Sequence, residues 1–190
     1  MELYFVTGNK HKVQEIQKVL GKKIQLIQKK LEIKEPALNS IEKIAKIKAV
    51  QAFKKIGKPL ITEDTGIYFN AFKNFPGTEP KREFEKLDFK GLLEKLKGKK
   101  RNAFFITAIC FVDAKGKRKT FSGKLHGRIT EKVFYEKKDV LPYEKIFIPK
   151  GKKRVLAFYS RKTKNKFSHR AKAARKLKKF LGSKSINYRI

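Results

Sequence analysis

Apolar positions in the first part of the chain follow a strand pattern and then a helical one. Residues 3–7 form a short apolar run that ends at Gly8, which predicts a strand followed by a turn. From residue 10 to residue 20 the apolar positions recur at helical spacing, and we expect a helix there. Ser40 and Glu42 suit the start of a second helix. Its buried face is expected to hold Ile41, Ile44, Ile47 and Ala52.

The remaining apolar runs predict mostly strands. Residues 58–62 predict a strand that stops at residues 63–66, and residues 67–72 are expected to continue as a strand after a sharp turn. A helix over residues 83–96 is expected to bury Leu87, Leu92, Leu93 and Leu96. The other expected elements are strands at residues 103–112, 118–122, 125–130 and 146–148, turns at residues 114–116 and around Gly123, and a basic helix at residues 171–181.

The order of these elements indicates an α/β fold. Strands and helices alternate first, and a run of strands follows. This order predicts one mixed sheet with helices packed around it, rather than a purely parallel sheet. No linker or repeat interrupts the chain before its last twenty residues, so we expect a single domain over residues 1–190.

The composition favours a water-soluble protein of the cytoplasm. Hydrophobic residues make up 40% of the chain, which is enough for a core although 35% of the residues are charged. No apolar run approaches the ~18 residues that a membrane span requires. The first residues also lack a signal-peptide pattern. The one cysteine, Cys110, lies in an apolar run and is expected to be a core thiol.

The net charge is extreme but does not by itself define a function. A formal charge of +33 favours polyanionic partners such as nucleic acid, an anionic membrane surface or phosphorylated small molecules. The lysines are spread along the whole chain, which indicates a general compositional bias more than one designed patch. Charge alone therefore does not separate a phosphate-handling enzyme from a nucleic-acid-binding protein.

The predicted strand–turn–helix joint at residues 7–12 is the first candidate site. Backbone N–H groups and the positive end of a helix suit an anion there. Thr7 and Asn9 add neutral donors, and Lys12 adds a positive charge. Such joints are common in α/β proteins, and the segment matches neither a Walker loop nor a dinucleotide fingerprint.

Two adjacent carboxylates, Glu63 and Asp64, form the second candidate site. They follow a predicted strand, and ligands of α/β proteins bind beyond the carboxyl ends of strands. Triphosphate enzymes hold Mg²⁺ with one or two carboxylates and the substrate phosphates. One carboxylate could hold the metal while the other activates water. The structural alternative is an acidic turn that caps the next element.

The third candidate site opens the predicted C-terminal helix. Ser168 is expected to be the N-cap, and Arg170 offers a planar donor fork for a carbonyl group or a phosphate. A lone histidine such as His169 has a structural role more often than a functional one. One cysteine and three histidines do not predict a zinc site, and the G-x-S-x-G elbow of many serine hydrolases is absent.

Taken in order, these motifs resemble those of the inosine/xanthosine triphosphate pyrophosphatase family. The matching segments are FVTGNKHKVQEI, PLITEDTGIYFNAF, FPGT, IFIPKG and KNKFSHRAKA, and together they extend over nearly the whole chain. The resemblance implies an elongated, curved mixed sheet with two lobes, a substrate cleft between them, and a homodimer. It also implies Mg²⁺-dependent hydrolysis of ITP, dITP and XTP to the monophosphate and pyrophosphate, which cleanses the nucleotide pool.

The resemblance also implies roles for individual residues. Asp64 matches the carboxylate that activates water, Glu63 matches a metal carboxylate, and Glu35 matches a second one, although the sequence around it fits poorly. Substrate contacts are implied for Thr7, Gly8, Asn9, Lys12, Lys48, Asp64, Lys81, Tyr143, Glu144, Lys164, His169 and Arg170.

The segment that would recognise the base departs from the family pattern. Residues 141–145 read LPYEK where the family has F-G-[YW]-D-P, so Leu141 replaces a base-stacking phenylalanine and Glu144 replaces an aspartate. Tyr143 is the remaining candidate to stack on the base. A glutamate that is usual in the family is Phe158 here, and residues 77–83 lack the usual aromatic residues. A pyrophosphatase with altered base specificity therefore stays open.

A second alternative is a basic nucleic-acid-binding protein on the same fold. Arginine and lysine residues cluster in the last thirty residues of the chain, which suits non-specific contact with phosphates. No aromatic stacking platform or base-reading motif accompanies this charge.

Overall fold

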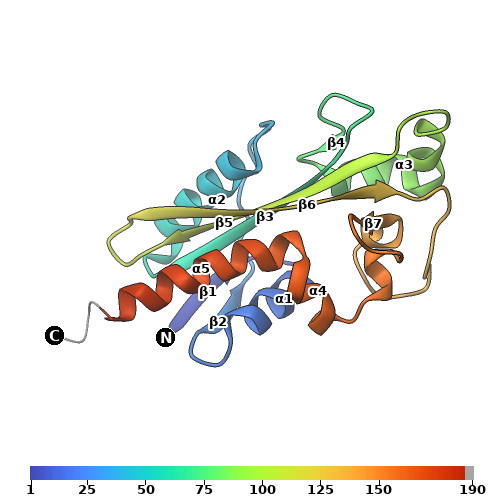
Figure 1. Ribbon diagram of the computed structural model, residues 1–190. Helices are drawn as coiled ribbons and strands as arrows, with labels where there is room; N and C mark the ends of the chain where they lie inside the picture. The colour runs from blue at the N-terminus through green and yellow to red at the C-terminus, as the bar shows by residue number, and fades with distance from the viewer. Residues whose placement is uncertain (187–190) are drawn as a thin grey trace.

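The computed structural model describes residues 1–186 as a mixed sheet flanked by helices (Figure 1). In the described residues the sheet has seven strands in the order β2-β1-β3-β5-β6-β7, with β4 paired to β3. The strands are β1 (Glu2–Val6), β2 (Gln25–Lys29), β3 (Leu60–Phe69), β4 (Pro76–Gly77), β5 (Asn102–Val112), β6 (Arg118–Ile129) and β7 (Phe147–Pro149). The pairs β1–β2 and β1–β3 are parallel, and the other pairs are antiparallel. The predicted mixed sheet is therefore confirmed.

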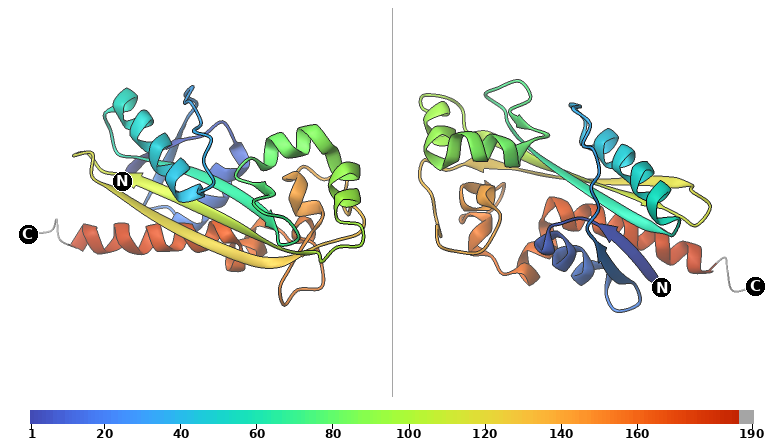
Figure 2. Two further views of the ribbon diagram at one scale, coloured as in Figure 1. Left: turned by 90° about the horizontal axis from the view of Figure 1, so that it is seen from above. Right: turned by 180° about the vertical axis from the view of Figure 1, so that it is seen from behind.

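Helices cover both faces of this sheet. They are α1 (Lys10–Leu20), α2 (Ile41–Ile56), α3 (Pro80–Lys95), α4 (Arg161–Phe167) and α5 (His169–Ile186), with 3₁₀ turns η1 (Pro142–Lys145) and η2 (Leu156–Phe158). Figure 2 shows α2 and α5 on opposite sides of the sheet. None of the helices in residues 1–186 combines the length and the apolar character that a membrane crossing requires.

Separate apolar cores lie in two lobes. Under α1 and α5, residues such as Ile16 and Leu177 pack with Ile61 of β3. Under α2, Ala45 and Ala49 belong to a second core with strand residues. The strands β3, β5 and β6 continue into the other lobe, where their residues pack with those of α3, η1, β7 and η2. Because these strands run through both lobes, they fix the position of one lobe relative to the other.

Two predicted interruptions of the sheet are wrong. The strand β3 runs without a break through residues 63–66, and β6 runs without a break through Gly123. Both glycines mark close packing instead of turns. A Cβ atom at Gly66 would lie 2.6 Å from the carbonyl oxygen of Gly77 in β4, and one at Gly123 would lie 2.2 Å from that of His169 in α5.

Other differences concern helix faces and short elements. Ile47 is 36% exposed, because the face of α2 that contacts the sheet is set by Ile41, Ala45 and Ala49. Leu92 of α3 and Leu96, which follows the helix, are buried, but Leu87 and Leu93 are only partly buried. The cause is a kink at Asp88, whose φ of 51° breaks the helical spacing. The elements β2 and α4 were not predicted, since both are short and polar.

The predicted helix caps and core thiol are confirmed. Ser40 accepts a hydrogen bond from the Lys43 N–H, and Ser168 accepts one from the Ala171 N–H at 3.2 Å. Both geometries are those of an N-cap side chain. Cys110 is fully buried, and burial raises the pKa of its thiol.

Gly123→Ala is expected to lower the melting temperature by about 5 °C. The added methyl group would meet the backbone of α5, which no side-chain rotation relieves. Overpacking of this kind costs about 1–3 kcal/mol, which corresponds to a few degrees in a chain of this size. Gly182→Ala in the same helix is the control, because a Cβ atom there meets nothing within 4 Å. Equal melting temperatures for both variants and the wild type would contradict the close packing of α5 on β6.

Candidate functional site

The candidate site lies where β1 ends beside β3. The parallel pairing of these strands runs from Tyr4↔Leu60 to Val6↔Thr62 and then stops. The chain turns there at Gly8 into α1, so the next two residues of β3, Glu63 and Asp64, lie beyond the carboxyl end of β1. This is the place where ligands of α/β sheets bind.

The alternation of side chains along β3 separates the two carboxylates. Asp64 lies on the side of α2, where its Oδ1 is 3.8 Å from Lys48 Nζ, and Lys48 also pairs with Glu35. Glu63 lies on the opposite side, toward α1 and α5, and is 2% exposed. Since neighbouring strand residues point to opposite faces, the two carboxylates have different environments.

The loop before α1 is held in shape by its own side chains. The hydroxyl of Thr7 accepts a hydrogen bond from the Asn9 N–H at 3.1 Å. The Asn9 side chain caps α1 by accepting a hydrogen bond from the His11 N–H at 2.9 Å. These contacts fix the positive end of α1 next to Lys12, whose side chain is 18% exposed. The arrangement suits an anion.

Six charged side chains form a buried chain of ion pairs in which three carboxylates alternate with three cations. In order its members are Glu144, Lys164, Glu15, Arg170, Glu63 and Lys12, with separations of 2.7, 3.1, 2.6, 3.2 and 2.6 Å. We call this set the ion-pair chain. It links α1, β3, η1, α4 and α5, and opposite charges balance along it.

The cations of the ion-pair chain lower the pKa of two of its three carboxylates, Glu63 and Glu15, whereas burial raises the pKa of the third, Glu144. Burial alone would raise the pKa of Glu63, but the positive charges of Lys12 and Arg170 outweigh it and lower that pKa to about 2. Burial alone would also raise the pKa of Glu15, but the positive charges of Arg170 and Lys164 outweigh it and lower that pKa to about 2. Both carboxylates are therefore ionised at neutral pH.

Asp64 differs from its neighbour Glu63. Burial raises the pKa of Asp64 to about 6, although the charges of Lys12 and Lys48 oppose the shift. Burial alone would lower the pKa of Lys48, but the negative charges of Asp64 and Glu35 raise it by more, so the net shift is upward. The site thus holds one carboxylate that is firmly ionised and one that takes up a proton more readily.

His169 and Arg170 are buried rather than presented to solvent. The imidazole of His169 stacks on Phe105 with ring centroids 4.4 Å apart, and burial lowers its pKa to about 3. It is therefore neutral, and its Nδ1 has no hydrogen-bond partner in the described part of the chain. Arg170 is 1% exposed and is occupied by Glu15 and Glu63.

The side chains of two predicted site residues are engaged outside the ion-pair chain. Tyr143 is 5% exposed, and its hydroxyl donates a hydrogen bond to the carbonyl oxygen of Pro80 at 3.0 Å. Its ring belongs to the core under α3. The side chain of Lys81 is 90% exposed and pairs with Glu85. Although Tyr143 precedes Glu144 in η1, neither side chain takes part in the ion-pair chain.

Sequence reasoning missed Glu15, Thr65 and Thr107. Glu15 lies at the centre of the ion-pair chain, and Thr65 donates a hydrogen bond to Glu63 at 2.5 Å. Thr107 of β5 contacts Thr65 at 2.5 Å. A signal for Glu15 existed, because it lies three residues after Lys12 and next to Ile16 on the buried face of α1. No local signal marks the threonines.

The carboxylates of this site fit Mg²⁺ only if phosphate oxygens of a substrate supply further ligands. In residues 1–186, no three His, Cys, Asp or Glu side chains converge as a metal site. The side chain of Glu35 is 67% exposed beside Lys48 and could hold a metal, with phosphate oxygens completing the coordination. Glu63 could bind the metal only after Lys12 has moved away from it, because its carboxylate is engaged by Lys12, Arg170 and Thr65.

Comparison with known proteins identifies relatives over almost the entire chain. The model of the Ham1 family matches residues 3–180. The chain is 35% identical to a dITP/XTP pyrophosphatase of Hyperthermus butylicus over 184 residues, which is 94% of either chain. It is 31% identical to an inosine triphosphate pyrophosphatase of Saccharomyces cerevisiae over 191 residues, 95% of either chain.

Solved structures share the fold. The Ham1 protein of Staphylococcus aureus matches with a TM-score of 0.79 at 24% identity, covering 97% of this chain and all of that one. A HAM1 protein of Coxiella burnetii matches with a TM-score of 0.80 at 23% identity, covering 96% of this chain and 99% of that one.

Glu15→Gln is expected to change how stability depends on pH. The pKa of Glu15 is lowered from 4.5 to about 2 by folding, so its contribution is complete above pH 4.5 and is lost as the pH falls toward 2. Urea unfolding at several pH values should show a wild-type decrease on the order of 3 kcal/mol from this group. The variant should be less stable at pH 7, because Arg170 and Lys164 lose a partner, and should lose less on acidification.

Glu131→Gln provides the control for this measurement. The Glu131 side chain is 86% exposed and 3.9 Å from Arg101, so the same chemical change should leave the pH profile almost unaltered. Parallel profiles for the wild type and the Glu15→Gln variant would show that the ion-pair chain contributes no pH-dependent stability through Glu15.

Proposed function

Because this chain belongs to the Ham1 family, we propose that it hydrolyses the non-standard purine triphosphates ITP, dITP and XTP to the monophosphate and pyrophosphate. Relatives that carry these activities in their names match it over nearly its full length. The observation that carries the proposal is the pair of adjacent carboxylates in β3 that lie just beyond the carboxyl end of β1. Glu63 is neutralised by Lys12 and Arg170, whereas Asp64 stays at the edge of the site beside Lys48.

The cations near Asp64 are suited to hold a triphosphate. A triphosphate carries about four negative charges near neutral pH, and catalysis of its hydrolysis depends on positioning and charge neutralisation. Lys12 and Lys48 come from α1 and α2 on opposite faces of the sheet and both act on Asp64 electrostatically. We assign the phosphates to the space between these lysines and the first turn of α1, close to Gly8.

Asp64 is our candidate for the group that takes the proton of the attacking water. Its raised pKa makes it a better proton acceptor than an ordinary aspartate. Glu63 lacks access to solvent, and we assign it the role of holding Lys12 in place. Mg²⁺ bound by Glu35 and phosphate oxygens would neutralise further charge on the triphosphate.

We propose Lys164 for recognition of the purine edge; to donate a hydrogen bond to the base, its ammonium must release one of its three contacts with Glu144 and Glu15. The 6-keto oxygen of hypoxanthine or xanthine accepts a hydrogen bond, whereas adenine presents an amino group at that position. An ammonium group donates only, so it fits a keto purine and leaves adenine unpaired. Glu144 holds Lys164 through both carboxylate oxygens, at 2.7 and 2.9 Å. Since Arg170 and His169 are buried, we assign them to positioning the site.

We place the protein in the cytoplasm as a homodimer; its one cysteine is a buried free thiol and needs no oxidising compartment. Nucleic-acid binding is not assigned as its main role. Two cations of the C-terminal cluster, Lys164 and Arg170, are consumed by the ion-pair chain, so any contact with nucleic acid involves other residues.

Pyrophosphate release from a panel of triphosphates tests the proposed activity. With Mg²⁺ present, ITP, dITP and XTP should be cleaved at least about a hundredfold faster than ATP, GTP, CTP and UTP, because unpaired polar groups in a buried site are costly. Without a divalent metal the rate should fall. Similar rates on all substrates would show that residues 141–145 no longer support discrimination, and no cleavage of any would remove the proposal.

Asp64→Asn is expected to reduce turnover of ITP by at least about a hundredfold while binding is largely retained. The change removes a proton acceptor but leaves Lys12 and Lys48 in place. Asp88→Asn is the matched control, since Asp88 lies in α3 and Asn can still accept the hydrogen bond from the Gly91 N–H. Single-turnover rates and ITP binding should be measured for both. A near-normal rate for Asp64→Asn would assign water activation to another group.

A further inference from the structure

The outer side of β6 and α5 forms a surface that contains no acidic side chain. Neither β6 nor α5 includes an aspartate or glutamate, and α4, which precedes α5, has none either. By contrast, α2 carries Glu42, and α3 carries several acidic residues. We call the solvent-facing residues of β6 and α5 the β6–α5 face. Positive charge on this face is therefore not offset by neighbouring carboxylates of the same elements.

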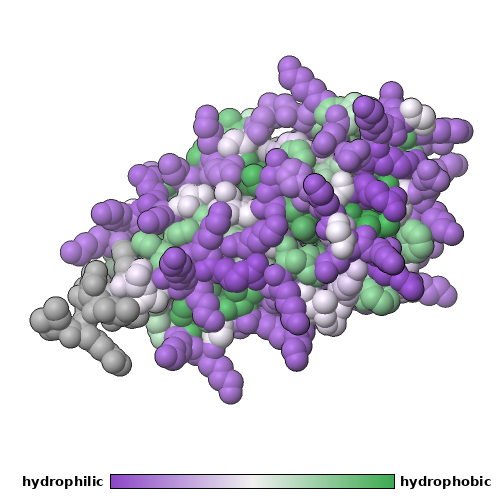
Figure 3. Space-filling model, viewed as in Figure 1, coloured by the Kyte–Doolittle hydropathy of each residue, from purple (hydrophilic) through white to green (hydrophobic). Residues whose placement is uncertain are grey.

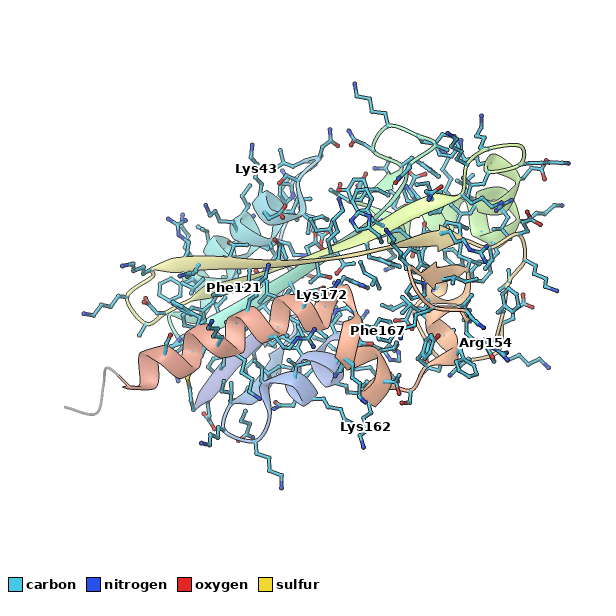
Figure 4. The ribbon with its side chains drawn as sticks, in the orientation of Figure 1. Lys43, Phe121, Arg154, Lys162, Phe167 and Lys172 are labelled. Atoms are coloured by element: carbon cyan, nitrogen blue, oxygen red, sulfur yellow. The ribbon has the colours of Figure 1, made fainter. Side chains whose placement is uncertain are left out.

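Backbone contacts hold several of its cations in place. Lys172 Nζ donates a hydrogen bond to the carbonyl oxygen of Lys124 at 2.8 Å, and Lys176 Nζ donates one to that of Ser122, also at 2.8 Å. Arg175 donates one to the carbonyl oxygen of Asn165 at 2.6 Å. Carbonyl groups carry no net charge, so these bonds order the side chains without neutralising them. Figure 4 shows Lys172 where α5 passes the sheet.

A shallow hollow lies beside the contact between α5 and β6. Its volume is about 500 Å³, and it is lined by Ile106, Ser122, Gly123, Lys124, Lys172, Arg175 and Lys176. The exposed imidazole of His126 lies near Lys124, Lys150 and Lys172, and slight burial together with these charges lowers its pKa. Hydrophilic side chains project from much of the molecule on this side (Figure 3). The face thus combines ordered cations with a concave, positive surface.

We propose that the β6–α5 face binds the phosphate backbone of double-stranded nucleic acid without reading its sequence. Cations that are held in place by backbone contacts suit a polyanion, and such binding releases counterions. Single strands are bound through exposed aromatic rings, but Lys124 covers the ring of Phe104 at 3.6 Å, and Phe121 is 8% exposed. This binding is independent of the proposed pyrophosphatase activity, because none of the candidate site residues belongs to this face.

Two other partners fit this face less well. An interfacial helix inserts an apolar side into a membrane, but the apolar residues of α5 are already packed in the core under α1. They include Ala173, Ala174, Leu177 and Leu181. A second copy of the chain would place the same cations opposite each other across a two-fold axis, and like charges would repel.

Binding of a mixed-sequence 20-base-pair DNA duplex, titrated at several salt concentrations, tests this proposal. The triple variant Lys124→Gln, Lys172→Gln and Lys176→Gln should bind about tenfold or more weakly than the wild type and should lower the salt slope by about 3. The matched control replaces Lys43, Lys54 and Lys55 by Gln. These are exposed lysines of α2, a helix on the side of the sheet opposite to α5, and Lys43 is marked in Figure 4.

The control triple should change the salt slope by less than about 1, and both triples should keep the ITP turnover of the wild type. Equal weakening by the two triples would overturn the proposal, because the affinity would then come from diffuse charge. Absence of duplex binding would also overturn it, as would binding only to phosphatidylserine-containing vesicles. ITP turnover serves as an independent readout, so loss of the proposed enzyme activity cannot be confused with loss of this surface.

Discussion

The guanidinium of Arg170 has no access to water, and its charge must be balanced inside the protein. Glu15 of α1 and Glu63 of β3 approach it at 2.6 and 3.2 Å. A buried charge without its partners costs several kcal/mol, so α1, β3 and α5 can pack together only in the arrangement that completes both ion pairs. Lys164 extends the ion-pair chain to Glu144 of η1, which couples the core under α1 and α5 to the second lobe.

This constraint explains why two neighbouring carboxylates behave differently. Glu63 points into the ion-pair chain and keeps its charge, whereas Asp64 points to the other face of β3, where burial raises its pKa. The alternation of a β-strand is sufficient to divide one motif into a structural carboxylate and a reactive one. We assign to Glu63 the role of ordering Lys12 and to Asp64 that of accepting a proton, so the same division separates these two roles.

Periodicity and local signals in the sequence predict much of the fold, while contacts between distant segments remain hidden. The apolar spacing of α1 and α2 and the hydroxyl caps of Ser40 and Ser168 are local, and the structure confirms them. The turn predicted at Gly123 is wrong because the local sequence does not show why a glycine is needed there. The glycine leaves room for the backbone of α5, which lies about fifty residues later in the chain. Motif resemblance located Glu63, Asp64 and Arg170, but their pairing with Glu15 depends on how α1 docks against α5.

A crystal structure of the protein with a non-hydrolysable ITP analogue is the most direct test of this account. We expect the triphosphate to lie between Lys12, Lys48 and the first turn of α1, with Asp64 beside the phosphates. Arg170 should remain bound to Glu15 and Glu63 in the complex. Phosphates located elsewhere, for example on the β6–α5 face, or an Arg170 side chain released to contact the ligand, would contradict it.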